Sequence, residues 1–161
     1  MTPHDDSVAA EPLVIDVATP DEWDAVAELL TASSLPLGGA REHLHEFVVA
    51  RRGDAIVGCA GVEQYKDAGL LRSVAVAAAD RGTGTGSALV TRCIADARAA
   101  GIRQLVLLTT TARHYFPRFG FEVIERAAVP DTLHESAELR GACPASATVM
   151  RLALGVDAGQ T

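Results

Sequence analysis

The sequence has 161 residues, of which 48% are hydrophobic and 22% are charged, and its formal net charge is −7. This length accommodates one domain with a single core, and the composition is that of a globular protein. The acidic balance argues against a nucleic-acid module, which normally presents a basic surface to phosphates. No apolar run reaches the ~18–20 residues that a membrane helix needs, and the first residues lack a secretory pattern. We therefore expect a cytoplasmic protein with neither a nucleic-acid nor a membrane partner.

The cysteines and histidines do not form a recognisable metal or disulfide pattern. Cys59, Cys93 and Cys143 are odd in number and far apart, which fits neither a disulfide framework nor a zinc motif, so reduced thiols are expected. His43 and His45 are two residues apart and would diverge on a helix, so no metal is predicted. One alternative, in which the three thiols together bind trivalent arsenicals, stays open, although nothing in their spacing brings them together.

The ends of the chain are predicted to be flexible tails. Residues 1–10 and 155–161 consist mostly of small or polar side chains and lie outside the apolar patterning. The intervening residues 11–154 are therefore expected to form a single domain. Sheet edges in domains of this size often pair, so a homodimer is one arrangement open to the chain.

The first elements are predicted to be a strand and a helix. A short β-rich run at 13–17 predicts the strand. Thr19, Pro20 and Glu22 then have the pattern of a helix start, in which the Glu22 carboxylate closes a capping box. The apolar spacing that follows predicts a helix over 20–32.

The middle of the chain is predicted to contain a hairpin and a parallel βαβ unit. The runs 47–50 and 55–62 flank a compact turn, which indicates an antiparallel hairpin. The strand pattern of 70–76, the amphipathic pattern of 86–100 and the apolar pattern of 104–109 indicate two parallel strands joined by a helix. The remaining short helices, strands and one loop-plus-helix insertion are expected at 40–46, 112–118, 121–126, 130–140 and 144–153.

A glycine-rich segment, Arg81-Gly82-Thr83-Gly84-Thr85-Gly86, lies between that strand and that helix. Glycine lets the backbone approach a ligand closely, the exposed amides can face an anion, and the helix N-terminus adds partial positive charge. The segment therefore predicts an anion-binding turn. It lacks the spacing of a dinucleotide-binding motif and the lysine of a nucleoside-triphosphate loop, so a different phosphate-bearing ligand is expected.

The same segment is similar to the acyl-CoA motif of the Gcn5-related N-acetyltransferase (GNAT) superfamily, Arg/Gln-x-x-Gly-x-Gly/Ala, which Arg81, Gly84 and Gly86 match. The run 115–121 resembles the aromatic-x-x-x-Gly-Phe segment of that family. The resemblance covers about residues 12–154. It implies an α/β fold with a mixed, mostly antiparallel sheet of six to seven strands, a central parallel βαβ unit and helices on both faces. It also implies transfer of an acetyl group from acetyl-CoA, without a metal, to the primary amine of a small molecule.

The resemblance implies roles for the residues of a cofactor site. The amides of the glycine-rich turn would bind the CoA pyrophosphate, and the preceding strand would hydrogen-bond the pantetheine arm. A bulge of Val74 to Val76 away from the parallel neighbour would free those amides. The expected cofactor-binding residues are Val74, Ala75, Val76, Arg81, Gly82, Thr83, Gly84, Thr85, Gly86 and Phe116.

The catalytic acid and base are less clearly marked in the sequence. Many superfamily members carry a tyrosine at the position of Phe116, where it protonates the departing thiolate. Tyr115 is one residue away and would point in another direction, so we expect it to pack or lie at the surface. Acetyl transfer also needs a base to take a proton from the attacking ammonium, directly or through water. Glu63, which follows the apolar run 56–62, is the candidate.

Four residues are candidates for binding the amine substrate. Arg72 and Arg140 carry guanidinium groups, which bind carboxylate, phosphinate or arsonate oxygens in two-point fashion. Ser73 and Thr109 are candidate polar contacts.

A narrower resemblance, to the arsenic-resistance N-acetyltransferase subgroup, is carried by residues 70–76, 108–112 and 139–147. It implies an amino-acid analogue such as arsinothricin or phosphinothricin as the acceptor. Two alternatives remain open. One is a sensor that binds acyl-CoA without turnover, and the other is a transferase that acetylates a protein N-terminus or lysine.

Overall fold

The computed structural model of the chain describes residues 11–142 and 146–154. The segments 1–10 and 155–161, predicted to be tails, lie outside the described residues, and so does Cys143. Within the described part, no helix combines the length and the apolar character needed to cross a membrane.

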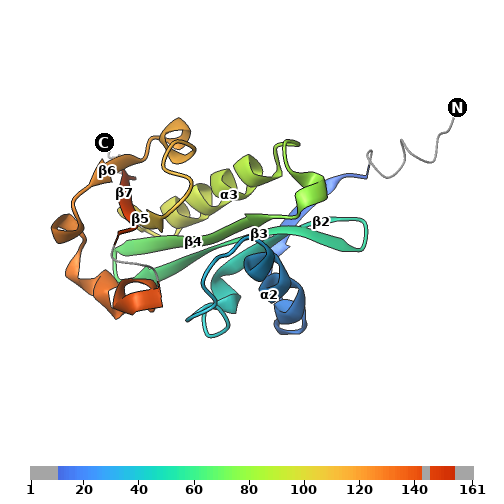
Figure 1. The fold of residues 1–161 in the computed structure, drawn as a ribbon, viewed down its shortest axis with the longest axis horizontal. Helices are drawn as coiled ribbons and strands as arrows, with labels where there is room; N and C mark the ends of the chain where they lie inside the picture. Colours follow the sequence, from blue (N-terminus) through green and yellow to red (C-terminus); the bar gives the residue numbers. More distant parts are fainter. Residues whose placement is uncertain (1–10, 143–145, 155–161) are drawn as a thin grey trace, which may run out of the picture.

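A seven-stranded sheet forms the centre of the fold (Figure 1), with the strand order β1-β2-β3-β4-β5-β7-β6. Neighbouring strands are antiparallel except β4 and β5, which are parallel. This arrangement confirms the expected mixed, mostly antiparallel sheet with one parallel βαβ unit. The strands are β1 Leu13–Val17, β2 Phe47–Arg52, β3 Ala55–Tyr65, β4 Ala68–Val76, β5 Gln104–Thr109, β6 Glu122–Ile124 and β7 Thr148–Ala153.

Two α-helices lie on opposite faces of this sheet, as expected (Figure 1). They are α2, Trp23–Ala32, and α3, Thr85–Ala99. Successive residues of a strand point to opposite faces, so Phe47 of β2 packs in the α2 core while Val48 packs in the α3 core. Both cores are apolar, and together they hold β2, β3 and β4 between the two helices.

The start of α2 follows the sequence pattern, with one difference. The expected helix over 20–32 begins as a turn of 3₁₀ helix, Pro20–Glu22, and only then becomes α2. The Thr19 amide donates to Glu22 Oε1 at 2.9 Å, which is the hydrogen bond expected of a capping box.

Several shorter elements differ from the prediction. The segments 40–46 and 112–118 contain only short 3₁₀ helices, Leu44–Glu46 and Phe116–Phe119. The second ends at Gly120, whose φ of +101° lies in the left-handed region that terminates a helix. The strands predicted at 121–126 and 144–153 are also shorter than expected, as the bounds of β6 and β7 show.

The predicted insertion at 130–140 covers the face of the sheet opposite α3. It contains a 3₁₀ helix, Asp131–Glu135, and a single π-helical turn, Glu138–Ala142. Leu133 is fully buried in a core that includes Leu70 of β4 and Val106 of β5. This segment therefore lies beside the parallel strand pair, next to the place where the two strands separate.

Candidate active site

The parallel strands β4 and β5 pair only at their beginnings. Ala68–Leu70 pair with Gln104–Val106, and beyond this point the two strands diverge. Between Gly61 and Cys59 of β3, the register against β4 moves from Arg72 to Ala75, so β4 contains one extra residue. Ser73 lies within this bulge and has a φ of +63°. Val74 to Val76 are thus separated from the parallel neighbour as expected, but the bulge itself lies at Ser73 and Val74, and Ala75 and Val76 pair regularly with β3.

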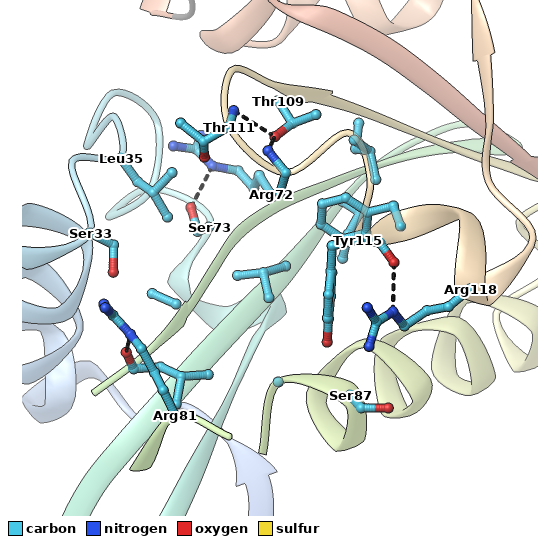
Figure 2. A pocket seen from close by; sticks show the side chains of 18 of the residues that line it. Ser33, Leu35, Arg72, Ser73, Arg81, Ser87, Thr109, Thr111, Tyr115 and Arg118 are labelled. Carbon is cyan, nitrogen blue, oxygen red and sulfur yellow. Dashed lines mark hydrogen bonds between the residues drawn. The ribbon is translucent and has the colours of Figure 1, made fainter. Parts of the chain in front are cut away.

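The divergence of β4 and β5 opens a cavity of about 850 Å³. Its walls come from β4, the glycine-rich turn, the first turn of α3, the end of β5 and the segment 111–118. In Figure 2, Arg72, Ser73, Thr109 and Thr111 gather at one end, whereas Arg81 and Ser87 lie toward the other. The cavity is thus elongated, with the glycine-rich turn at one end and the end of β5 at the other.

Most of the predicted cofactor-binding residues line this cavity. Eight of the ten do so: Val74, Ala75, Val76, Arg81, Gly82, Gly84, Gly86 and Phe116. The side chains of Thr83 and Thr85 are turned away from it and hydrogen-bond to Asp80 instead. The turn is therefore two-sided, with glycines toward the cavity and threonines toward the protein.

The glycines of the turn are needed for their backbone conformation. Gly82 has a φ of +82° and Gly84 a φ of +91°, and Gly84 is the residue that precedes α3. A Cβ at either position would meet no atom within 4 Å, so crowding is not the reason for glycine there. The left-handed backbone is the reason, since it is strained for any residue with a side chain.

Asp80 is a site residue that sequence reasoning missed. Its side chain is almost buried beneath the turn, and Oδ1 accepts from Arg52 Nε at 3.0 Å. Burial alone would raise the pKa of Asp80, but hydrogen bonds from Thr85 and Arg52 and the charge of Arg52 outweigh burial, so the pKa lies below its usual value. The sequence feature that could have indicated Asp80 is its position directly before a turn that contains two threonines, whose hydroxyls can donate to a carboxylate.

Arg72 lines the end of the cavity opposite the glycine-rich turn, but its guanidinium is largely occupied. Nη1 donates to Gly38 O and to Glu63 Oε2, both at 2.7 Å, Nη2 donates to Pro36 O, and Nε donates to Ser73 Oγ. Four of the five N–H groups are thus engaged, which leaves one for a ligand. The two-point binding expected of Arg72 is not available in this arrangement.

Glu63 lies behind Arg72 and does not line the cavity. It is fully buried within β3, where its Oε1 accepts from the Tyr65 hydroxyl at 2.6 Å. His43 Nε2 lies 3.9 Å from the same oxygen, and His43 is partly exposed. A base at this position has to act through a relay rather than by direct contact with an amine. The base role of Glu63 stays a prediction.

The other predicted substrate residues divide into two groups. Ser73 and Thr109 line the cavity. The Thr109 Oγ1 atom already accepts from the Ala112 amide at 2.9 Å, so this side chain also stabilises the turn after β5. Arg140, by contrast, is exposed on the C-terminal insertion and does not line the cavity, so the structure does not bring it to the site as predicted.

Tyr115 packs against the α3 core, as expected, and it also lines the cavity (Figure 2). A Cβ at Gly86 would lie 3.3 Å from its hydroxyl oxygen, so the hydroxyl lies beside the first turn of α3. The Arg118 guanidinium stacks 4.3 Å above its ring. Phe116 is buried next to it and contributes its ring to the core.

The two described cysteines, Cys59 and Cys93, are both buried. Cys59 packs in the α2 core and Cys93 in the α3 core, on opposite faces of the sheet. Burial raises the pKa of each thiol to about 12. No group of three or more His, Cys, Asp or Glu side chains suited to a metal occurs among the described residues.

The chain belongs to a known family of transferases. The model of the acetyltransferase (GNAT) domain matches residues 43–123, half of the chain, which include β4, the glycine-rich turn and α3. The family resemblance found in the sequence is thereby confirmed. The narrower resemblance to the arsenic-resistance subgroup is not supported by this match.

Two similar proteins are amino-acid acetyltransferases. The one from Pseudomonas fluorescens (strain Pf0-1) is 38% identical over 81 residues, which is 49% of this chain and 19% of that protein. The one from Aeromonas salmonicida (strain A449) is 26% identical over 119 residues, 73% of this chain and 26% of that protein. The chain therefore spans about a fifth to a quarter of the length of these relatives.

Solved structures share the fold at low sequence identity. N-acetylglutamate synthase from Neisseria gonorrhoeae, complexed with coenzyme A and N-acetyl-glutamate, superimposes with a TM-score of 0.77 and 23% identity. The match covers 90% of this chain and 36% of the synthase. A GNAT-family acetyltransferase from Staphylococcus aureus Mu50 has a TM-score of 0.74 and 15% identity, with 89% of this chain and 100% of that one covered. At sequence identities this low, the similarity to these two structures shows a shared fold.

Proposed function

We propose that this chain transfers the acetyl group of acetyl-CoA to the primary amine of an amino acid or a close analogue of one. The observation that carries the proposal is the elongated cavity where β4 and β5 diverge, with the glycine-rich turn of α3 at one end. The family match and the amino-acid acetyltransferase relatives support the same reaction. The coenzyme A named in the structure of the similar synthase supports the cofactor.

The proposed reaction assigns a task to each part of the cavity. The amides and positive end of the turn bind the diphosphate, and Arg81 adds a cation at its edge. The part of β4 that has separated from β5, Val74 to Val76, offers amides to the pantetheine arm and to the oxyanion that forms when the amine attacks the thioester. The carbonyl carbon of the acetyl group gains a bond to the amine nitrogen and loses its bond to sulfur. The proton of the amine leaves through a base, for which Glu63 acting through a relay is the candidate.

The acceptor is proposed to bind at the end of the cavity formed by β4 and the end of β5. Ser73 from the bulge, with Thr109 and Thr111, lines this end, and Leu35 from the chain after α2 lies beside it (Figure 2). The remaining N–H of Arg72 offers one donor to an anionic oxygen. Arsinothricin and phosphinothricin are amino-acid analogues of this kind, and as acceptors they rest on the narrower sequence resemblance alone.

A thiol-release assay with acetyl-CoA tests the proposal. The purified protein is supplied with a panel of amino acids, phosphinothricin, arsinothricin and a lysine-containing peptide, and the free CoA thiol is measured over time. We expect release that depends on both protein and a free amino acid or analogue, with the N-acetyl product confirmed by mass spectrometry. Peptide acetylation alone would instead favour a protein acetyltransferase.

Calorimetry separates the remaining alternatives. If CoA and acetyl-CoA bind but no amine in the panel is acetylated, the sensor alternative is favoured over the transferase. If neither CoA nor acetyl-CoA binds, the proposed function is wrong. Asp96→Asn is the control variant, because Asp96 lies on α3 but outside the cavity and should bind the cofactor as the unaltered protein does.

A further inference from the structure

The two threonines of the glycine-rich turn share one buried partner, the Asp80 carboxylate. The Thr85 hydroxyl donates to Asp80 Oδ2, and Thr83 Oγ1 lies 3.3 Å from the same oxygen and 2.6 Å from the Asp80 carbonyl oxygen. The two hydroxyls are also 3.0 Å apart. Thr85 is almost completely buried. Each hydroxyl carries one proton, so Thr85 donates to the Asp80 carboxylate and Thr83 donates chiefly to the nearer Asp80 carbonyl oxygen, and these two hydrogen bonds hold the protein-facing side of the turn.

We propose that Asp80 is a positioning residue that pre-organises the turn for the diphosphate of the cofactor. This inference rests on the proposed function, because it assigns the diphosphate to the turn. A segment with three glycines in six residues is intrinsically free to adopt many backbone conformations, and fixing it on binding costs conformational entropy. Asp80 removes that cost in advance, because it fixes Thr83 and Thr85 and so turns Gly82, Gly84 and Gly86 toward the cavity.

The negative charge of Asp80 has to be balanced, because this residue also lines the cavity that would receive an anion. Arg52 provides the balance, since its Nε donates to Asp80 Oδ1 at 3.0 Å. Arg52 comes from the end of β2, and its Nη1 also donates to Glu11 O at 2.9 Å. The pair therefore ties the hairpin of β2 and β3 to the turn and leaves the backbone amides and Arg81 to face the diphosphate.

The decisive variants remove the hydroxyls without changing any charge. Thr83→Val together with Thr85→Val keeps the size of both side chains but deletes their hydrogen bonds to Asp80. We expect the Kd for CoA, measured by calorimetry, to rise about tenfold, since each lost hydrogen bond of this kind has a net effect of about 0.5–1.5 kcal/mol. Arg52→Met should also raise the Kd for CoA, because it leaves the Asp80 charge unbalanced beside the anion.

Three controls distinguish positioning from general damage to the fold. Thr83→Ser with Thr85→Ser restores the hydroxyls and should bind CoA within about twofold of the unaltered protein. Thr91→Val makes the same chemical change on an exposed part of α3 and should have no effect. Acetyl-pantetheine lacks the diphosphate, so its binding should be unchanged in the valine variant, whereas a damaged cavity would weaken both ligands equally.

The outcomes separate this inference from the proposed function. If the unaltered protein binds no CoA, the proposed function fails. If it binds CoA and the double valine variant binds CoA equally well, or loses CoA and acetyl-pantetheine alike, Asp80 does not position the turn and this inference is wrong. If the double variant does not fold, the single variant Thr83→Val is measured instead. Thr83 is exposed and lies outside α3, so this change should not prevent folding, and an unchanged Kd for CoA would contradict the inference.

Discussion

Glu63 and Arg72 form a buried ion pair, in which Oε2 and Nη1 lie 2.7 Å apart and neither side chain is more than 1% exposed. The pair joins β3 to β4. Through the Arg72 hydrogen bonds to Pro36 O and Gly38 O, it also holds the chain that follows α2 against the sheet. Because Leu35 of that chain lies beside the proposed acceptor end of the cavity, the ion pair sets the shape of that end.

Glu63→Gln is expected to destabilise the protein by about 3 kcal/mol, because it removes the charge of the nearer of two buried carboxylates beside Arg72; the other, Glu138, has Oε2 3.5 Å from Nε. Urea unfolding measures the change. Asp96→Asn breaks the exposed pair with Arg92 and should cost less than about 1 kcal/mol. If the two variants lose equal stability, the buried pair does not have the role assigned to it.

The same variant tests the predicted base. If Glu63 acts as the base through a relay, we expect kcat/KM for the amine to fall and the pH profile to lose the limb that the base produces. A fall in kcat/KM with an unchanged pH profile would contradict the base role and leave Glu63 as a residue that positions Arg72. Full kcat/KM across the pH range would contradict both the base role and the positioning of Arg72.

Gly84→Ala and Gly101→Ala form a matched pair at the two ends of α3. Their φ values are +91° and +84°, and a Cβ at either meets nothing within 4 Å. Each variant should therefore lose about 1–2 kcal/mol of unfolding free energy from backbone strain alone. Only Gly84→Ala should weaken CoA binding by calorimetry. Equal CoA affinity in both variants would show that the turn does not contact the cofactor.

Tyr115→Phe is expected to leave kcat almost unchanged. The Tyr115 hydroxyl lies beside Gly86 at the start of α3, which is the phosphate end of the cavity rather than the acetyl end. Burial raises the pKa of this hydroxyl, so it is protonated at neutral pH and its position, not its protonation state, argues against an acid role. Thiol-release kinetics at saturating acetyl-CoA measure kcat. A fall of about a hundredfold or more, typical of a lost general acid, would assign the acid role to Tyr115.

The lowered pKa of Asp80 should make the free energy of unfolding depend on pH. A carboxyl group whose pKa is lowered in the folded state stabilises that state above its unfolded pKa of about 3.9 and loses this effect as the pH falls through the folded pKa. The difference in unfolding free energy between the unaltered protein and Asp80→Asn should therefore be constant above about pH 5 and shrink below about pH 4. A difference that grows on acidification would contradict the lowered pKa.

Cys59 and Cys93 should be unreactive in the native protein. Both thiols are buried, and with pKa values near 12 they are almost fully protonated at neutral pH. In a Cys143→Ser variant, a chromogenic disulfide reagent should label neither thiol until denaturant unfolds the chain, when both should react. Rapid native labelling would reopen the alternative in which thiols bind arsenicals.

The sheet was predictable because its signals are local. The apolar run 104–109, the amphipathic spacing of 86–100 and the glycines between strand and helix each act within a few residues, and together they predict the βαβ unit. The short elements near 40–46 and 112–118 were predicted less well. Nearby glycine and proline limit each of them to a short 3₁₀ helix, and their bounds depend on contacts with the rest of the fold.

The sequence by itself determined the parallel strand pair, the glycine-rich turn and the family, because backbone conformation and apolar periodicity are properties of neighbouring residues. Only the tertiary structure decided that Arg72 is held by Glu63, that Asp80 is paired with Arg52, and that Arg140 lies away from the cavity. Burial and ion pairing join residues that are far apart in the chain, so their energies depend on which strands become neighbours.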